Sequence, residues 1–76
     1  MINLVALRRS TGMTQVQLAA RLGVGQAQVS KIERQADMLI STLSSYLAAL
    51  GVQAKIVVEV GDQTETYDLT QGREAR

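Results

Sequence analysis

Apolar residues recur every three or four positions through residues 1–51, the spacing of one buried face of an α-helix. Glycines interrupt this pattern, and Thr14 with Gln17 has the spacing of a capping box, which begins a helix. The pattern predicts four helices, over about residues 3–10, 14–22, 26–35 and 41–50. The buried stripe of the second helix is expected to contain Val16, Leu18, Ala19 and Leu22.

After Gly51 apolar residues alternate with polar ones, which is the period of a β-strand with one covered face. The dipeptide Gly61-Asp62 is typical of a two-residue hairpin loop, and this loop places Ile56 opposite Tyr67 and Val58 opposite Glu65. Residues 52–70 are therefore predicted to form a β-hairpin, and residues 71–76 a tail. The expected fold class is mainly α: a small four-helix domain over residues 1–51 followed by the C-terminal β-hairpin.

The stretch from Leu18 to Arg34 contains Gly23 and Gly25, so it is either one weakened helix or two helices with a corner between them. Two helices explain it better, because Ala19 is small where helices cross closely and Gly23 suits a turn with positive φ. This arrangement is a helix-turn-helix over residues 15–34, whose second helix enters the DNA major groove. The residues expected to hold the corner are Leu18, Ala19, Leu22, Gly23, Val24, Val29 and Ile32.

Composition narrows the possible chemistry. The chain has no Cys and no His, which excludes disulfides, most transition-metal sites and the commonest general base. We therefore predict no enzyme activity, no metal and no cofactor. Residues 1–35 carry five basic side chains against one acidic, and residues 36–72 carry one basic against five acidic. An anionic partner is thus expected for the first part. With no signal-peptide pattern and no long apolar run, we expect no membrane partner and a cytoplasmic, nucleoid-associated protein.

The helix-turn-helix segment resembles the Cro/repressor-type (Xre) family, whose pattern reads roughly T-Q-x-x-L-A-x-x-x-G-V-x-x-x-x-V-S-x-I-E. The matching positions are Thr14, Gln15, Leu18, Ala19, Gly23, Val24, Val29, Ser30, Ile32 and Glu33. This resemblance covers about residues 4–51. The stretch "DMLISTLSSYLAALGVQAKIVVEVGDQTETYDL" is similar to the C-terminal half of HigA-type antitoxins of type II toxin–antitoxin pairs, in which a helix ending in "ALG" leads into a short β-hairpin.

The outward face of the third helix is polar, with no acidic residue before Glu33, and for an arbitrary helix a solvated surface would be the simplest interpretation. Gln and Lys, however, bind the base edges of adenine and guanine. With the resemblance, this predicts base contacts from Gln26, Ala27, Ser30 and Lys31. Phosphate contacts are expected from Gln15, Gln28, Arg34 and Arg9. The resemblance also implies a structural pair between Arg8 and Glu33. Gly25 departs from the Ser, Thr or Asp common in the family, which removes one side-chain contact.

An isolated two-stranded hairpin is marginal in water, and a small chain without disulfides or a metal gains stability from a partner subunit. We therefore predict a homodimer in which two hairpins meet edge to edge, with Ile56, Val58 and Tyr67 at the interface and against the fourth helix. Its two recognition helices would face successive major grooves of a palindromic operator in double-stranded DNA. The alternative is a monomer whose hairpin folds back on its own helices.

These observations predict a dimeric, sequence-specific transcriptional repressor, autoregulatory and of the antitoxin kind. The resemblance implies a small RelE/HigB-like toxin as partner, neutralised by binding in the region of the acidic residues Glu59, Glu65 and Asp68. Two alternatives stay open: a stand-alone Xre-type regulator without a toxin, and a protein-interaction module that has lost DNA binding.

Overall fold

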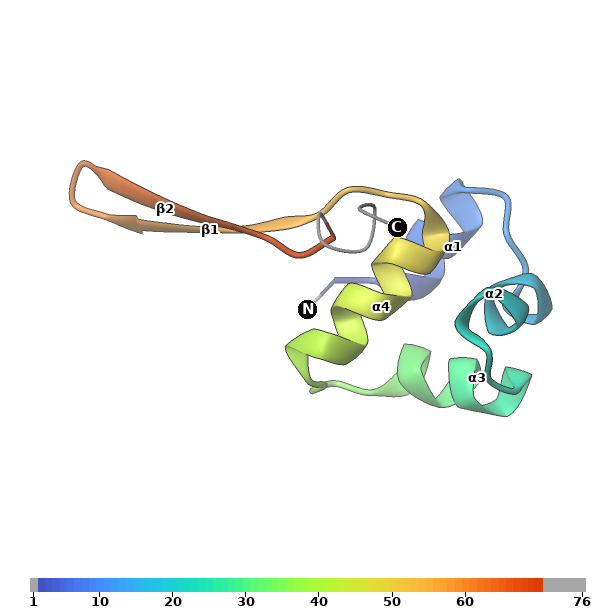
Figure 1. The fold of residues 1–76 in the computed structure, drawn as a ribbon. Coiled ribbons are helices and arrows are strands. Elements are labelled where there is room, and N and C mark those ends of the chain that lie inside the picture. The colour runs from blue at the N-terminus through green and yellow to red at the C-terminus, as the bar shows by residue number, and fades with distance from the viewer. Residues whose placement is uncertain (1, 71–76) are drawn as a thin grey trace.

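The computed structural model describes residues 2–70, and Figure 1 shows its helices gathered in one body from which a two-stranded hairpin projects. In chain order the elements are α1 (Leu4–Ser10), α2 (Gln15–Leu22), α3 (Gln26–Arg34), α4 (Ile40–Leu50), β1 (Lys55–Val60) and β2 (Gln63–Asp68). The predicted fold of four helices followed by a C-terminal β-hairpin is confirmed. Residues 71–76, predicted to be a tail, lie outside the described residues.

Helices α1 and α2 begin at side chains that accept hydrogen bonds from backbone amides of the first turn, which have no partner inside the helix. At α1 the Asn3 side chain accepts from the Ala6 amide at 3.0 Å. At α2 the Thr14 hydroxyl accepts from the Gln17 amide at 3.1 Å, and the Gln17 side chain accepts from the Thr14 amide at 2.9 Å. The predicted capping box is therefore confirmed.

Two glycines end helices in the left-handed conformation. Gly23 has φ 74° after α2, and Gly51 has φ 80° after α4, a region that residues with a Cβ rarely adopt. Gly23 turns the chain into α3, and Gly51 turns it toward the hairpin. Helix α4 begins at Ile40, just before the predicted start at Ser41, and ends before Gly51 as predicted.

The core lies where the helices meet, and it includes one residue that follows the hairpin. Leu18, Val29 and Tyr46 are fully buried. Leu69, directly after β2, belongs to the same cluster and so ties the base of the hairpin to the helices. Full burial of an apolar side chain such as Leu18 or Val29 contributes about 1.5–3 kcal/mol to the free energy of folding. The other buried apolar residues are Leu4, Ala19, Ile32, Leu47 and Leu50.

Two valines expected in the interior lie at the surface. Val16 is 60% exposed, because α2 buries the side that carries Leu18 and Ala19, and Val16 lies off that stripe. Val24 is 41% exposed, because the turn between α2 and α3 places it at the rim of a shallow groove rather than under the helices. The predictions that these two side chains are buried are therefore wrong.

Hydrogen bonds fix the base of the hairpin to α4. The Ser44 hydroxyl donates to the Leu69 carbonyl. The Leu69 amide donates to the Ala54 carbonyl at 2.9 Å, and the Ala54 amide donates to the Thr70 hydroxyl at 3.3 Å. Thr70 is buried, and its amide donates to the Asp68 carboxylate at 3.0 Å. The hairpin thus leaves the body from an anchored base.

The hairpin has the predicted register but not the predicted surroundings. Ile56 lies opposite Tyr67 and Val58 opposite Glu65, as the alternation predicted. The strands then run away from the helices (Figure 1), so that Val58 is 49% exposed and Tyr67 62% exposed. Of these apolar residues, Ile56 packs partly against the core. In the single chain Leu69, not Val58 or Tyr67, lies against the helices. The contact predicted for Val58 and Tyr67 with the fourth helix in the dimer stays a prediction. A hairpin folded back on its own helices is not observed either.

Candidate nucleic-acid interface

The corner between α2 and α3 is a short turn from Gly23 to Gly25. The Val24 amide donates to the Ala19 carbonyl at 3.0 Å, which closes the end of α2. Helix α3 begins after Gly25, whose backbone is extended and which provides no side-chain cap. Fully buried Leu18 of α2 and Val29 of α3 hold the two helices together from the inside. The opposite side of α3, its outward face, is left to solvent.

The outward face of α3 carries mostly polar side chains that are accessible to a partner. Its exposed members include Gln26, Ala27, Gln28, Lys31 and Arg34. Ser30 is half-buried, and its hydroxyl accepts a hydrogen bond from Arg34 Nη1 at 2.6 Å. Because this face carries cations and amides but no carboxylate, it suits an anionic partner that offers hydrogen-bonding edges.

A buried ion pair lies directly behind this face. Arg8 Nε of α1 donates to Glu33 Oε2 at 2.6 Å, and Arg8 Nη2 lies 3.4 Å from Glu33 Oε1. Arg8 Nη1 also donates to the Met13 carbonyl at 3.0 Å. The Glu33 side chain is only 2% exposed. The pair predicted between Arg8 and Glu33 is therefore present, and it connects α1 to the end of α3.

Tyr46 of α4 completes this ion pair, and sequence reasoning missed it. The phenol donates to Glu33 Oε2 at 2.6 Å and lies 3.2 Å from the Leu4 carbonyl. The ring is fully buried. A signal was available, because a tyrosine on the apolar side of a helix needs a hydrogen-bond partner in the interior. Its partner on another helix was not visible from spacing alone.

The three groups shift one another's titration. The hydrogen bond to Glu33 raises the pKa of Arg8, against the opposing effect of burial. Burial raises the pKa of Glu33, but hydrogen bonds from Arg8, Tyr46 and Gln15 outweigh it and hold that pKa below its usual range. Burial, with the hydrogen bond to Glu33, raises the pKa of Tyr46 well above its ordinary value. At neutral pH Glu33 and Arg8 are charged and Tyr46 is protonated, so the cluster orients neighbouring groups and does not exchange protons.

A chain of hydrogen bonds continues from the ion pair to the outward face of α3. Gln15 Nε2 donates to Glu33 Oε1 at 2.9 Å. Gln26 Nε2 in turn donates to Gln15 Oε1 at 3.1 Å. Because a carboxylate only accepts, Glu33 fixes which end of the Gln15 amide points toward it. Gln15 therefore presents its oxygen to Gln26 and holds that side chain at the start of α3.

The remaining predicted phosphate contacts lie on two elements. Arg9 is exposed in the last turn of α1, whereas Gln28 is exposed on α3 beside the groove that Val24 borders. The structure thus brings Gln15 to Gln26 and Arg34 to Ser30, but it leaves Arg9 on a separate helix.

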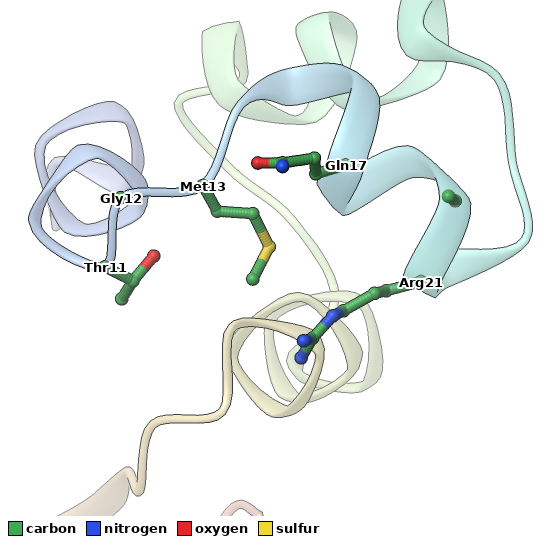
Figure 2. A pocket seen from close by; sticks show the side chains of 6 residues that line it. Thr11, Gly12, Met13, Gln17 and Arg21 are labelled. Atoms are coloured by element: carbon green, nitrogen blue, oxygen red, sulfur yellow. The ribbon is translucent and has the colours of Figure 1, made fainter.

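A shallow hollow of about 360 Å³ lies beside α2 and is shown in Figure 2. Thr11, Gly12 and Met13 border it on one side, and Gln17 and Arg21 of α2 on the other. Arg21 reaches toward α4, where Nη1 donates to the Ala49 carbonyl at 3.2 Å. Among the lining residues only Arg21 is ionisable, so this hollow offers no acid–base pair for catalysis.

A model of the Xre-type helix-turn-helix domain matches residues 4–56, which cover α1 to α4 and the start of β1. The chain belongs to the helix-turn-helix family. Within the described residues 2–70, no helix of this family member is long and apolar enough to cross a membrane.

Relatives of this helix-turn-helix protein include three antitoxins of Mycobacterium tuberculosis (strain H37Rv). Antitoxin HigA1 is 41% identical over 58 residues, 75% of this chain and 39% of that protein. Putative antitoxin HigA2 is 40% identical over 62 residues, 79% of this chain and 61% of the relative. Putative antitoxin HigA3 is 42% identical over 65 residues, 80% of this chain and 59% of the relative. The chain therefore spans about two fifths to three fifths of the length of these relatives.

Two solved structures share the fold at 38% sequence identity, and each match covers 87% of this chain and 88% of the other chain. One is DNA-bound antitoxin HigA3, with a TM-score of 0.80. The other is a HigA antitoxin whose unique dimerization is described as inducing DNA bending, with a TM-score of 0.74. Both solved structures are thus described as antitoxins that bind or bend DNA.

Proposed function

We propose that this protein is a HigA-type antitoxin that binds double-stranded DNA through α3 and represses its own transcription. The observation that carries the proposal is the match to a DNA-bound antitoxin over 87% of this chain and 88% of that chain. The outward face of α3 supports it, because this face is exposed and free of carboxylates. A cytoplasmic location at the nucleoid follows from this function.

Base recognition is assigned to Gln26, Ala27, Ser30 and Lys31. Gln26 uses one amide hydrogen on Gln15, which leaves a second hydrogen and the carbonyl oxygen. These two groups are the ones that bind N7 and N6 of adenine together. Lys31 is exposed and suits guanine O6 and N7. The Ala27 methyl group suits a thymine methyl.

Phosphate binding is assigned to Gln15, Gln28, Arg34 and Arg9. Gln15 stands at the first position of α2, where free backbone amides and the helix dipole favour an anion. Its amide keeps one hydrogen after the bond to Glu33. Arg34 is held by Ser30 at the end of α3, and Arg9 adds positive charge from α1.

We further infer a homodimer that binds a palindromic operator, with residues 52–70 as the dimerisation segment and residues 1–51 as the DNA-binding region. The exposed apolar residues of the hairpin support it, since Val58 and Tyr67 have little cover in the single chain. Ile56, Val58 and Tyr67 are assigned to the interface. Two-fold symmetry would bring two copies of α3 to successive major grooves, roughly 34 Å apart.

A small RelE/HigB-like toxin is the protein partner that this proposal implies. The exposed acidic residues Glu59, Glu65 and Asp68 of the hairpin suit a basic protein. The second candidate is a stand-alone regulator, and a small toxin gene beside this one separates the two. A module that has lost DNA binding is the third candidate, and the exposed, carboxylate-free face of α3 argues against it.

The test is a fluorescence-anisotropy titration with a labelled duplex from the upstream region of the gene, against a scrambled duplex, at two salt concentrations. Specific, salt-sensitive binding of at least about 1000-fold preference is expected. Replacing Lys31 by Ala is expected to weaken operator binding by about 1–3 kcal/mol and to relax preference at one base position. Arg21→Ala is the matched control. It also removes one positive charge, but from α2 and not from the outward face of α3. Equal, weak binding to both duplexes would reject the function.

A further inference from the structure

The outer edge of β1 has backbone groups that the hairpin does not use. The Leu69 amide donates to the Ala54 carbonyl, so this pair is of the hydrogen-bonded kind. Hydrogen-bonded and non-hydrogen-bonded pairs alternate along antiparallel strands. Lys55, Val57 and Glu59 therefore belong to non-hydrogen-bonded pairs, and their amides and carbonyls point away from β2. Such an edge is a template for another strand.

The two edges of the hairpin differ in chemistry. Along β1 the central residues are Ile56, Val57 and Val58, and Val57 is 48% exposed. Along β2 the residues opposite them are Tyr67, Thr66 and Glu65, all exposed and with one apolar side chain among the three. Covering the β1 edges of two hairpins therefore removes more apolar surface from water than covering their β2 edges. The β2 edges suit the outside of a joined sheet.

We propose that two copies of the chain join along the outer edges of β1, antiparallel, with Val57 directly opposite the partner's Val57. The result is a four-stranded sheet in the order β2, β1, the partner's β1 and the partner's β2. This inference rests on the homodimer of the proposed function and names its edge and its register. It adds Lys55, Val57 and Glu59 to the interface, none of which the apolar alternation had singled out.

Charge selects this register. Centring the pairing on Val57 places Lys55 directly opposite the partner's Glu59, and two-fold symmetry repeats the pair. Opposite charges across antiparallel strands stabilise the sheet, whereas like charges destabilise it. Centring on Lys55 or on Glu59 would place two ammonium groups or two carboxylates face to face. Pairing along β2 instead would join strands whose charged residues, Glu65 and Asp68, are both acidic.

The experiment compares two single-cysteine variants of the full chain, which has no cysteine of its own. Val57→Cys and Thr66→Cys lie directly opposite each other in the hairpin, and both positions are exposed. In the proposed sheet the two Val57 positions are within disulfide reach, whereas the two Thr66 positions are three strand spacings apart, about 14 Å. Under the same mild oxidation, Val57→Cys is expected to give about tenfold more covalent dimer.

Light scattering on the unoxidised proteins separates the possible results. Preferential cross-linking of Val57→Cys in a dimer supports the proposal. Preferential cross-linking of Thr66→Cys, or a dimer in which neither variant cross-links, overturns it and leaves the DNA-binding function standing. A monomer that nevertheless binds the operator specifically overturns both this edge and the proposed homodimer.

A charge reversal tests the register by itself. Glu59→Lys places two like-charged pairs across the proposed edge. The dissociation constant of the dimer is therefore expected to rise about tenfold. Glu65→Lys is the matched control, because it makes the same change of net charge on β2, away from the joined edges. Equal effects of the two variants would show that overall charge, not this register, governs association, and would overturn the pairing of Lys55 with the partner's Glu59.

Discussion

The helical body and the hairpin distribute polar and apolar side chains in opposite ways. The body buries an ionised pair, Arg8 and Glu33, and covers it with the ring of Tyr46. The hairpin exposes valines and a tyrosine, with Val60 67% exposed near its tip. Within residues 2–70 every buried side-chain nitrogen or oxygen has a hydrogen-bond partner, so the charges in the body are fully compensated.

This contrast shows which region one chain completes by itself. In the body Arg8, Gln15 and Tyr46 each donate from a different helix to Glu33, and this network ties α3 to α1, α2 and α4. The hairpin closes its own ladder but leaves an apolar surface and free strand edges, which a single copy cannot cover. The body thus presents α3 with its own contacts completed, whereas the hairpin keeps the exposed apolar side chains on which the proposed dimer rests.

The largest effect is expected when the buried pair is broken. Glu33→Gln leaves the Arg8 guanidinium buried without its counter-charge. The free energy of unfolding should therefore fall by about 3–5 kcal/mol. Urea denaturation followed by circular dichroism measures it. The exposed hairpin residue Glu65, changed to Gln, is the control and should shift stability by less than about 0.5 kcal/mol. Comparable losses in both variants would erase the distinction between body and hairpin.

A matched pair of valines gives the next largest difference. Val29→Ala removes two methyl groups from the fully buried side of α3 and leaves a cavity, with an expected loss of about 2 kcal/mol. Val60→Ala makes the same chemical change near the hairpin tip and should alter unfolding by less than about 0.5 kcal/mol. Both are read from urea midpoints at a protein concentration where the chain is monomeric. A loss at Val60 as large as that at Val29 would mean that the hairpin packs on the body.

Acid pH should produce the smallest and most gradual effect, through the same carboxylate. The pKa of Glu33 is lower in the folded chain than its ordinary value near 4.5, so the unfolded chain binds more protons between the two values. Its contribution is complete above about pH 4.5 and is lost as the pH falls through the folded pKa. The slope of stability against pH in this window should be shallower for Glu33→Gln. Identical slopes would show that Glu33 is not the titrating group.

Much of the helix-turn-helix and of the hairpin was predictable, because the signals for both are local in the sequence. The capping box at Thr14 and Gln17, the left-handed Gly23 and the hairpin register each depend on residues a few positions apart. Such signals are set by backbone geometry and by hydrogen bonds within one element, so a linear pattern contains them. Val16 was assigned wrongly because apolar spacing gives a stripe but not the neighbours that cover it.

The linkage behind α3 was predictable only in part. The pair of Arg8 and Glu33 came from resemblance, but the roles of Tyr46 and Gln15 in it did not, since they join residues on four helices. Which atoms of these side chains meet depends on how the helices cross. A hydrogen bond also needs its direction, and the orientation of the Gln15 amide follows from the carboxylate beside it.

The sequence by itself determined the order of the elements, the helix-turn-helix corner and the pairing of the two strands, because each depends on period, caps and turns. Only the tertiary structure decided that the hairpin leaves the helices and that Leu69 takes the place expected for Val58 and Tyr67 beside α4. Tertiary packing determines which of these residues is buried. All three occupy positions that the alternation assigns to one face, and only the path of the chain after Gly51 determines which of them reaches the core.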